Sequence, residues 1–329
     1  MFKILKKIFG IITLISVILC GNVVTGGCST QEKDGFSIVT TIFPQYDWVE
    51  EIIGEHEEKF NLTLLQDTGV DLHSYQPTAD DIVTIGKCDL FIYVGGHSDE
   101  WVSDVLEQAV NKDMIVINLM EVLNESDKLL VSGLEHDHEH NHDHEHNHDY
   151  DEHVWLSLIN AKLLCENISQ KICDIDPTNK ETYIANANAY CEKLNELNSE
   201  YQEVVNNAPI KTLLFGDRFS FKYTLNDYSI DYYAAFSGCS AESEASFETI
   251  TYLAGKIDEL GLNAVIKTES SDGELAKAII NASENKDAKI LTMNSMQSVT
   301  ASAVAEGADY LTIMESNLSV LRQALGEEE

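Results

Sequence analysis

The sequence predicts an α/β protein of two lobes, each with a mainly parallel sheet flanked by helices, joined by one long rigid helix beside a cleft. Short apolar runs alternate with helical stretches in both halves of the chain, a pattern typical of βαβ units. Between the halves, residues 178–206 contain neither proline nor glycine and carry apolar side chains at three- and four-residue steps. The 329 residues, 44% of them hydrophobic, are enough for two ordinary domains.

The first lobe is expected at residues 36–176. Its apolar runs are short, and helical stretches separate them, which is the order that a parallel sheet requires. The expected strands are 36–43, 59–65, 89–96 and 114–119, and the expected helices are 46–54, one that opens at Thr78, 99–111 and 157–175.

The linking helix is expected at residues 177–208, where Pro177 suits the first turn. About thirty helical residues would span about 45 Å at 1.5 Å per residue, which is longer than one small domain needs. The second lobe is expected at residues 209–329, and a ligand should bind in the cleft at the carboxyl ends of the strands. In this lobe the expected strands are 211–215, 230–236, 263–268 and 288–293, and the expected helices are 246–260, 273–285 and 306–325.

The composition argues against several classes of protein. The chain has 21 Lys+Arg against 56 Asp+Glu, a formal net charge of −35. Such a charge repels nucleic acid and anionic membrane surfaces, and it attracts cations. The seven cysteines include no C-x-x-C pair, which argues against a zinc ribbon or a thioredoxin-like site.

The N-terminus predicts export from the cell. Three lysines precede the apolar run 8–19, which is too short for a membrane span, so residues 1–27 are expected to be a signal peptide. The segment before Cys28 is similar to a bacterial lipobox, although Thr25 stands where lipoproteins usually carry leucine. We expect Cys28 to carry lipid and residues 28–35 to tether the protein to the outer face of the cell membrane. Ordinary cleavage with release is the alternative.

A histidine-rich acidic stretch follows the first predicted sheet. Neutral imidazole is a common ligand for zinc and related ions, and carboxylates add further ligands. No apolar periodicity lets residues 135–152 fold on their own, so we expect a solvated loop that captures metal. A charged linker or a tag is the alternative. Seven histidines alternate here with Asp, Glu or Asn: His136, His138, His140, His142, His144, His146 and His148.

Two H-E-x-x-H matches, 138–142 and 144–148, fall inside this repeat. That motif serves a metalloprotease only on a helix that places both histidines on one face. The repeat has no apolar face to dock such a helix. We therefore reject the protease interpretation.

Several motifs occur together in one order. The lipoprotein-type signal precedes DLHSYQPTADD, the His-rich loop, EHVWLS, and DPTNKETYIANANAY before the long helix. In this order the chain resembles the zinc- and manganese-binding substrate proteins of bacterial ABC transporters, over nearly all of its mature length. The resemblance implies two α/β lobes, a rigid linking helix and an interlobe site of about four nitrogen or oxygen ligands.

The resemblance implies two imidazole ligands. His73 matches the histidine of the family's H-x-Y-x-P segment, and it follows a strand in a loop. His153 matches the histidine of the H-V-W segment. The alternatives are a surface loop histidine for His73 and a further member of the capture loop for His153.

The second lobe departs from the family pattern. Arg218 aligns with a His or Glu ligand, and a guanidinium cannot bind a cation. Asn294 aligns with a family aspartate and is a weaker ligand. We expect Asp217, beside Arg218, to be the third ligand and Glu269 to be the next choice. Glu244 could instead pair with Arg218. The full set of candidates from this lobe is Asp217, Cys239, Glu242, Glu244 and Glu269.

The expected function is metal capture and delivery rather than catalysis. The resemblance implies a monomeric extracytoplasmic protein that holds a divalent metal and passes it to an ABC permease and its ATPase. Two imidazoles with one or two carboxylates suit Zn²⁺, and replacing nitrogen with oxygen favours Mn²⁺ or iron. A manganese- or iron-binding homologue and a surface metal buffer or adhesin are the alternatives. A metallohydrolase would need a placed general base, and no motif supplies one.

Overall fold

The computed structural model describes residues 35–124, 127–130, 150–236 and 245–326. All of them belong to one contact-connected unit, Gly35–Glu329. The predicted signal peptide, Cys28, the seven loop histidines and the candidates Cys239, Glu242 and Glu244 lie outside the described residues.

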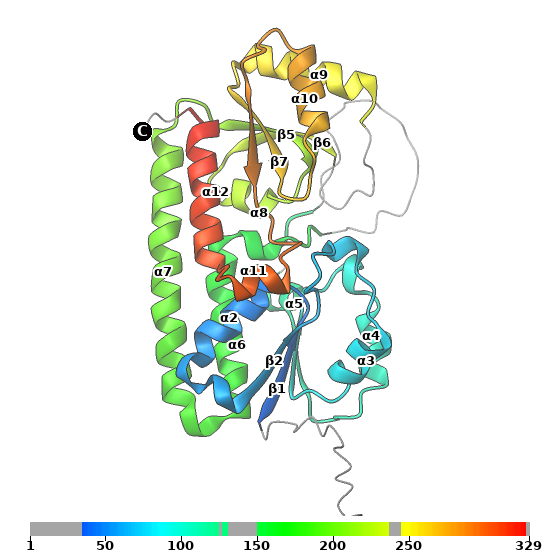
Figure 1. The fold of residues 1–329 in the computed structure, drawn as a ribbon. Helices are drawn as coiled ribbons and strands as arrows, with labels where there is room; N and C mark the ends of the chain where they lie inside the picture. The colour runs from blue at the N-terminus through cyan, green and yellow to red at the C-terminus, as the bar shows by residue number, and fades with distance from the viewer. Residues whose placement is uncertain (1–34, 125–126, 131–149, 237–244, 327–329) are drawn as a thin grey trace, which may run out of the picture. The chain divides into compact units, whose positions relative to one another are not determined.

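Two four-stranded sheets form the framework, and every strand pair in them is parallel (Figure 1). Their orders are β2-β1-β3-β4 and β6-β5-β7-β8, so both sheets place their first strand beside the second and third. The predicted fold class is confirmed. The strands are β1 Phe36–Thr40, β2 Phe60–Leu64, β3 Leu90–Tyr93, β4 Ile115–Asn118, β5 Thr212–Arg218, β6 Asp231–Phe236, β7 Ala264–Thr268 and β8 Lys289–Met293.

Helices alternate with these strands, as the apolar pattern predicts. Between the helices, 3-10 turns occur at Gly54–Lys59, Leu72–Ser74, His97–Asp99, Val154–Leu156 and Pro177–Asn179. The α-helices are α2 Phe43–Ile53, α3 Ala79–Ile85, α4 Val102–Glu107, α5 Leu119–Val122, α6 Leu158–Ile175, α7 Lys180–Asn207, α8 Lys222–Asp227, α9 Phe247–Leu260, α10 Glu274–Ala282, α11 Ala301–Ala305 and α12 Tyr310–Ala324.

Two boundaries differ from the prediction for identifiable reasons. The strand predicted over 36–43 ends at Thr40, because Pro44 lies in the first turn of α2 and favours a helix start there. The helix predicted over 306–325 begins only at Tyr310. Gly307 has a φ of +93°, which interrupts the helix, and the Asp309 side chain caps the next one by accepting from Thr312 N.

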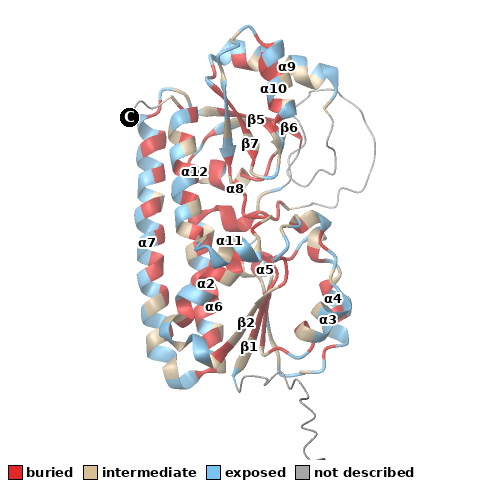
Figure 2. Cartoon of the chain, viewed as in Figure 1, coloured by how far each residue is buried: buried red, intermediate tan, exposed pale blue. Residues whose placement is uncertain are grey.

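The long helix α7 has 28 residues and spans about 42 Å at 1.5 Å per residue. It packs against α2, α6 and α12, so it contacts helices from both ends of the chain. The Tyr201 hydroxyl donates to the Met314 carbonyl at 2.6 Å and ties α7 to α12. A buried stripe runs along α7 (Figure 2): Tyr183, Ala187, Tyr190, Leu194, Leu197 and Tyr201.

One hydrophobic core extends through both sheets. Ile38 of β1 and Phe215 of β5 belong to the same buried cluster. Hydrogen bonds cross between the two halves inside it, since the Trp155 indole donates to the Ser295 carbonyl at 2.9 Å and the Tyr310 hydroxyl donates to the Trp155 carbonyl at 2.6 Å. Buried hydrogen bonds as well as apolar packing therefore join the two sheets. The lobe boundaries expected at residues 176 and 209 stay a prediction.

A buried carboxyl joins three of these helices and predicts a pH-dependent stability. Asp47 of α2 accepts from the Tyr190 hydroxyl of α7 at 3.1 Å and from the Tyr310 backbone of α12. Burial, followed by the charges of Glu51 and Asp309, raises the pKa of Asp47 to about 7. Because the folded protein then holds a proton that the unfolded chain releases, the free energy of unfolding should fall as pH rises from about 4 to about 7.

We expect Asp47→Asn to remove this dependence, because the amide is neutral and keeps an acceptor oxygen. Between pH 4 and pH 8 the stability of the variant relative to the wild type should rise by on the order of 2–4 kcal/mol. Urea unfolding at both pH values measures the change, with the exposed Asp113→Asn as control. An unchanged difference between variant and wild type would contradict the prediction.

Candidate metal centre

His73 is positioned by a short turn after β2. Asp71 caps the 3-10 turn Leu72–Ser74, and its Oδ1 accepts from the backbone N–H of His73 at 3.0 Å. This bond fixes the backbone that carries the imidazole. The His73 side chain is 14% exposed, so one edge of it still reaches solvent.

His153 is positioned by the segment before α6. It precedes the 3-10 turn Val154–Leu156 and is completely buried, with 0% exposure. Asp151 Oδ1 accepts from both the backbone N–H of His153, at 3.0 Å, and its Nδ1, at 2.9 Å. The Tyr223 hydroxyl of α8 donates to the Asp151 carbonyl at 2.9 Å and holds this segment from the other half of the chain.

The two imidazoles face each other. Their Nε2 atoms lie 3.3 Å apart, and their ring centroids 5.2 Å apart. The Nδ1 of His73 lies 2.7 Å from Ser98 Oγ, which donates to Glu152 Oε2 at 2.5 Å, so Ser98 must accept from His73. The Nδ1 of His153 donates to Asp151. These partners assign the proton of each neutral ring to Nδ1 and leave both Nε2 lone pairs pointing at one another.

Two facing acceptors are stable only with a cation between them, either a proton or a metal ion. Two nitrogens that each lie 2.0–2.1 Å from a tetrahedral zinc ion would be about 3.3–3.4 Å apart. The observed separation of 3.3 Å matches this value. The carboxylates behind the two rings are the supporting partners that metal-bound histidines usually have.

The two rings differ in their affinity for protons. Burial, followed by the charge of His153, lowers the pKa of His73 to about 4. Burial also lowers the pKa of His153, but the adjacent Asp151 carboxylate outweighs it, so this pKa is raised. At pH values below the pKa of His153, the pair is therefore expected to hold one extra proton on His153, within hydrogen-bonding distance of the Nε2 of His73.

The two carboxylates predicted as metal ligands from the second half of the chain, Asp217 and Glu269, accept hydrogen bonds from other residues. Asp217, in β5, accepts from the Thr268 backbone at 3.0 Å and from its hydroxyl at 2.6 Å. Glu269 accepts from the backbone and hydroxyl of Ser295 at 2.8 and 2.9 Å. Within the described ranges, no three His, Cys, Asp or Glu residues gather closely enough to hold a metal. The structure thus brings together His73 and His153, but joins neither Asp217 nor Glu269 to them.

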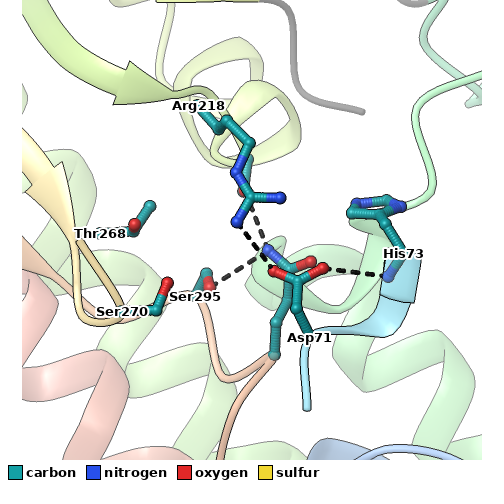
Figure 3. A pocket seen from close by; sticks show the side chains of 8 residues that line it. Asp71, His73, Arg218, Thr268, Ser270 and Ser295 are labelled. Carbon is teal, nitrogen blue, oxygen red and sulfur yellow. Dashed lines mark hydrogen bonds and ion pairs between the residues drawn. The ribbon is translucent and has the colours of Figure 1, made fainter. Parts of the chain in front are cut away.

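Arg218 has a partner that the sequence did not indicate. Its Nη2 lies 3.3 Å from Asp71 Oδ2 and forms an ion pair between β5 and the turn that carries His73 (Figure 3). The alternative partner, Glu244, lies outside the described residues. Asp71 also lines the site and acts electrostatically on both imidazoles. In the sequence, the one local indication of this role of Asp71 is its place two positions before His73.

Asn294, at the end of β8, has a structural role here. Its side-chain oxygen accepts from the Met296 backbone at 2.8 Å, and Met296 has a φ of +59°. This bond supports a left-handed turn, a conformation that is costly for a methionine. The family's aspartate position therefore holds a turn-stabilising amide in this chain.

A small pocket opens beside His73, where β5, β7 and β8 end (Figure 3). Its cavity volume is about 10 Å³, which is room for about one water molecule. The carboxyl ends of parallel strands are the usual place for a ligand in such sheets. Its lining residues are Asp71, His73, Arg218, Ser220, Thr268, Ser270, Ser295 and Gln297.

The fold and the histidine pair together define a class of protein. It consists of α/β binding proteins with two parallel sheets and a buried pair of imidazole nitrogens of the kind that bind metal ions. The chain belongs to the family described as "Zinc-uptake complex component A periplasmic", which it matches over residues 38–324. This match confirms the family resemblance that the sequence motifs indicated.

Individual relatives agree with this assignment. The high-affinity zinc uptake system protein ZnuA of Bacillus subtilis is 30% identical over 311 residues, which cover 94% of this chain and 93% of that protein. The zinc-binding lipoprotein AdcA of Streptococcus pneumoniae is 29% identical over 321 residues, which cover 96% of this chain. The chain spans 61% of the length of the AdcA relatives from Streptococcus pneumoniae and Streptococcus pyogenes.

Solved structures share the fold. The Zn(II)-bound ZnuA-like domain of Streptococcus pneumoniae AdcA is similar with a TM-score of 0.70 and 26% sequence identity. The similarity covers 89% of this chain and 100% of that domain.

Among the described residues, no helix is both long and apolar enough to cross a membrane.

Proposed function

We propose that the protein captures a zinc ion outside the cytoplasm and delivers it to an ABC permease and its ATPase. The observation that carries the proposal is the pair of Nε2 atoms, 3.3 Å apart, whose other ring nitrogens are both hydrogen-bonded. Lipid on Cys28 would keep the protein at the outer face of the cell membrane. The names of the relatives, which are zinc-binding or zinc-uptake proteins, support zinc over manganese or iron.

In this proposal His73 and His153 are the nitrogen ligands. Nitrogen donors favour zinc over manganese, which prefers oxygen. Asp217 and Glu269 remain predictions for the other positions, and each would have to exchange its present hydrogen bonds for the metal. We propose that these ligands serve the binding and release of a metal ion rather than catalysis.

A competition titration tests the proposal. The mature chain should bind one zinc ion tightly against a chromophoric chelator, and manganese much more weakly. The same titration on a chain without residues 136–148 separates the cleft site from the histidine loop. Absence of a tight zinc site in both proteins would overturn the proposal.

We expect the histidine loop to be dispensable for tight binding, because His73 and His153 lie outside it. Deleting residues 136–148 should lower the total number of zinc ions bound and leave one site with unchanged affinity. Equilibrium dialysis against zinc measures both quantities. Loss of the tight site on deletion would contradict this expectation and would move the main site into the loop.

Ser98 should contribute to affinity without touching the metal. Its hydroxyl orients His73 by accepting from Nδ1 and donating to Glu152. We expect Ser98→Ala to lower zinc affinity by about 10–100-fold, the usual cost of losing a supporting partner. Ser103→Ala, an exposed serine of α4, is the matched control. Equal affinities of the two variants would argue against the orienting role.

A further inference from the structure

A short helix of the second half, α8, contacts the segment that carries His153. We propose that α8 positions this proposed ligand, with Tyr223 as the main positioning residue and Thr224 as a second one. The inference rests on the proposed function and extends it to residues that act on the metal site through the backbone around His153.

The Tyr223 hydroxyl joins two stretches of the chain. It donates to the Asp151 carbonyl at 2.9 Å and accepts from the Leu129 backbone N–H at 3.2 Å. A phenolic hydroxyl can donate one hydrogen bond and accept another, so both bonds can form at the same time. The Tyr223 residue is 2% exposed, so water has little access to compete for either bond.

The two stretches that Tyr223 joins are also paired with each other. They stand at the two ends of residues 131–149. The Asp151 backbone N–H donates to the Leu129 carbonyl at 2.7 Å, and the neighbouring residues Leu130 and Tyr150 form an isolated antiparallel bridge. The tyrosine hydroxyl therefore completes a small hydrogen-bonded unit, which fixes the backbone of Asp151.

Other side chains of α8 hold the chain on the far side of His153. The Thr224 hydroxyl donates to the Leu156 carbonyl at 2.7 Å. Asp227, at the end of α8, accepts from the Ser157 hydroxyl at 2.6 Å. One helix of the second half thus contacts the backbone or side chains both before and after the imidazole.

The place of Asp151 matters because its carboxylate directs the imidazole. Its Oδ1 accepts from both the backbone N–H and the Nδ1 of His153. This contact places the ring proton on Nδ1 and leaves Nε2 facing that of His73, 3.3 Å away. Outer partners of this kind tune metal-binding histidines, and they act best when they are themselves held in place.

This arrangement gives the second half of the chain a role in metal binding that needs no ligand from it. The side chains of Asp217 and Glu269 accept hydrogen bonds from other residues, and Arg218 is paired with Asp71. Through α8, the second half would contribute to the site by holding a ligand of the first half in its binding orientation.

Zinc affinity of Tyr223→Phe tests the inference in the chain without residues 136–148. The substitution removes the hydroxyl and keeps the buried ring. We expect about tenfold weaker zinc binding in chelator competition, the lower end of the usual cost of losing an outer partner. The matched control is Tyr228→Phe, which removes another buried hydroxyl of the second half, one that donates to Asn198 Oδ1 at 2.8 Å. Its zinc affinity should equal that of the wild type.

Thr224 provides an independent pair of variants, which decides the matter if Tyr223→Phe does not fold. Thr224→Val removes the hydroxyl that holds Leu156 and keeps a similar shape, whereas Thr224→Ser keeps the hydroxyl. We expect weaker zinc binding for Thr224→Val and wild-type binding for Thr224→Ser. Equal zinc affinities of these two variants would contradict the positioning role of α8.

NMR of the metal-free protein gives a readout that a purely structural role would not change. After deletion of residues 136–148 the chain keeps four histidines: His56, His73, His97 and His153. The Nδ1–H resonance of His153 should shift in Tyr223→Phe, because its acceptor Asp151 moves, and stay in place in Tyr228→Phe.

Either an unshifted His153 resonance or an unchanged zinc affinity in a folded Tyr223→Phe would overturn the inference. A wild-type chain without any tight zinc site would instead overturn the proposed function. In that case the resonance alone decides whether α8 positions His153.

Discussion

Alanine in place of His153 should lower zinc affinity by more than the roughly 10–100-fold that loss of a supporting partner costs. The substitution removes a nitrogen ligand from a completely buried position, where water cannot easily replace it. It also leaves the Asp151 carboxylate without the N–H donor of the ring. His73→Ala should show a loss of similar order, because the two Nε2 atoms act as a pair.

The matched control is His97→Ala, which changes an exposed histidine of the same half of the chain. We expect its zinc affinity to equal that of the wild type in competitive titrations on the loop-deleted chain. Thermal unfolding without metal distinguishes a lost ligand from a lost fold, since His73→Ala removes a partly exposed ring and should cost little stability. An unaffected His73→Ala would refute the site assignment itself.

Zinc affinity should fall about tenfold for each pH unit below the raised pKa of His153. The metal-free pair holds one proton in that range, on His153, and zinc must displace it. His73 contributes no second proton until the pH approaches its own pKa of about 4. Zinc affinity is thus highest above the pKa of His153. Below this pKa, the logarithm of the affinity should fall by one for each pH unit, whereas two independently titrating histidines would give a fall of two.

Calorimetry in buffers of different ionisation enthalpy counts the protons directly. The loop-deleted chain should release about one proton per zinc below the pKa of His153, and fewer above it. His97→Ala again serves as the control that keeps the pair intact. A release of two protons, or an affinity that is equal at pH 5.5 and 7.5, would contradict the single-proton arrangement.

The fold was predictable because it depends on local periodicity. The eight apolar runs all became parallel strands, and the stretch without proline or glycine became α7. The predicted boundaries were wrong where a single residue interrupted the periodic pattern of apolar residues. Gly307 interrupted the last predicted helix, and the short helices α5, α8 and α11 are too brief to produce a periodic signal.

The site was predictable only in part, because its contacts join distant segments. His73 and His153 stand in motifs that could be matched one by one, and the structure brings them together. The Arg218–Asp71 pair links residues 147 positions apart, and nothing in either local sequence indicates it. The hydrogen bonds that engage Asp217 and Glu269 likewise depend on how β5, β7 and β8 align, which composition and spacing do not reveal.

The buried hydrogen bonds between the two halves restrict how the proposed metal site could open. Separating the halves as rigid bodies would break the buried bonds of Trp155 to Ser295 and Tyr310 and expose the segment that follows His153. The turn that carries His73 is joined to the second half by the partly exposed Asp71–Arg218 ion pair, and the His73 ring already reaches solvent. If the two histidines bind the metal as proposed, we expect His73 to be the outer ligand, which meets an arriving ion first and releases a departing one first, and the buried His153 to be the inner ligand.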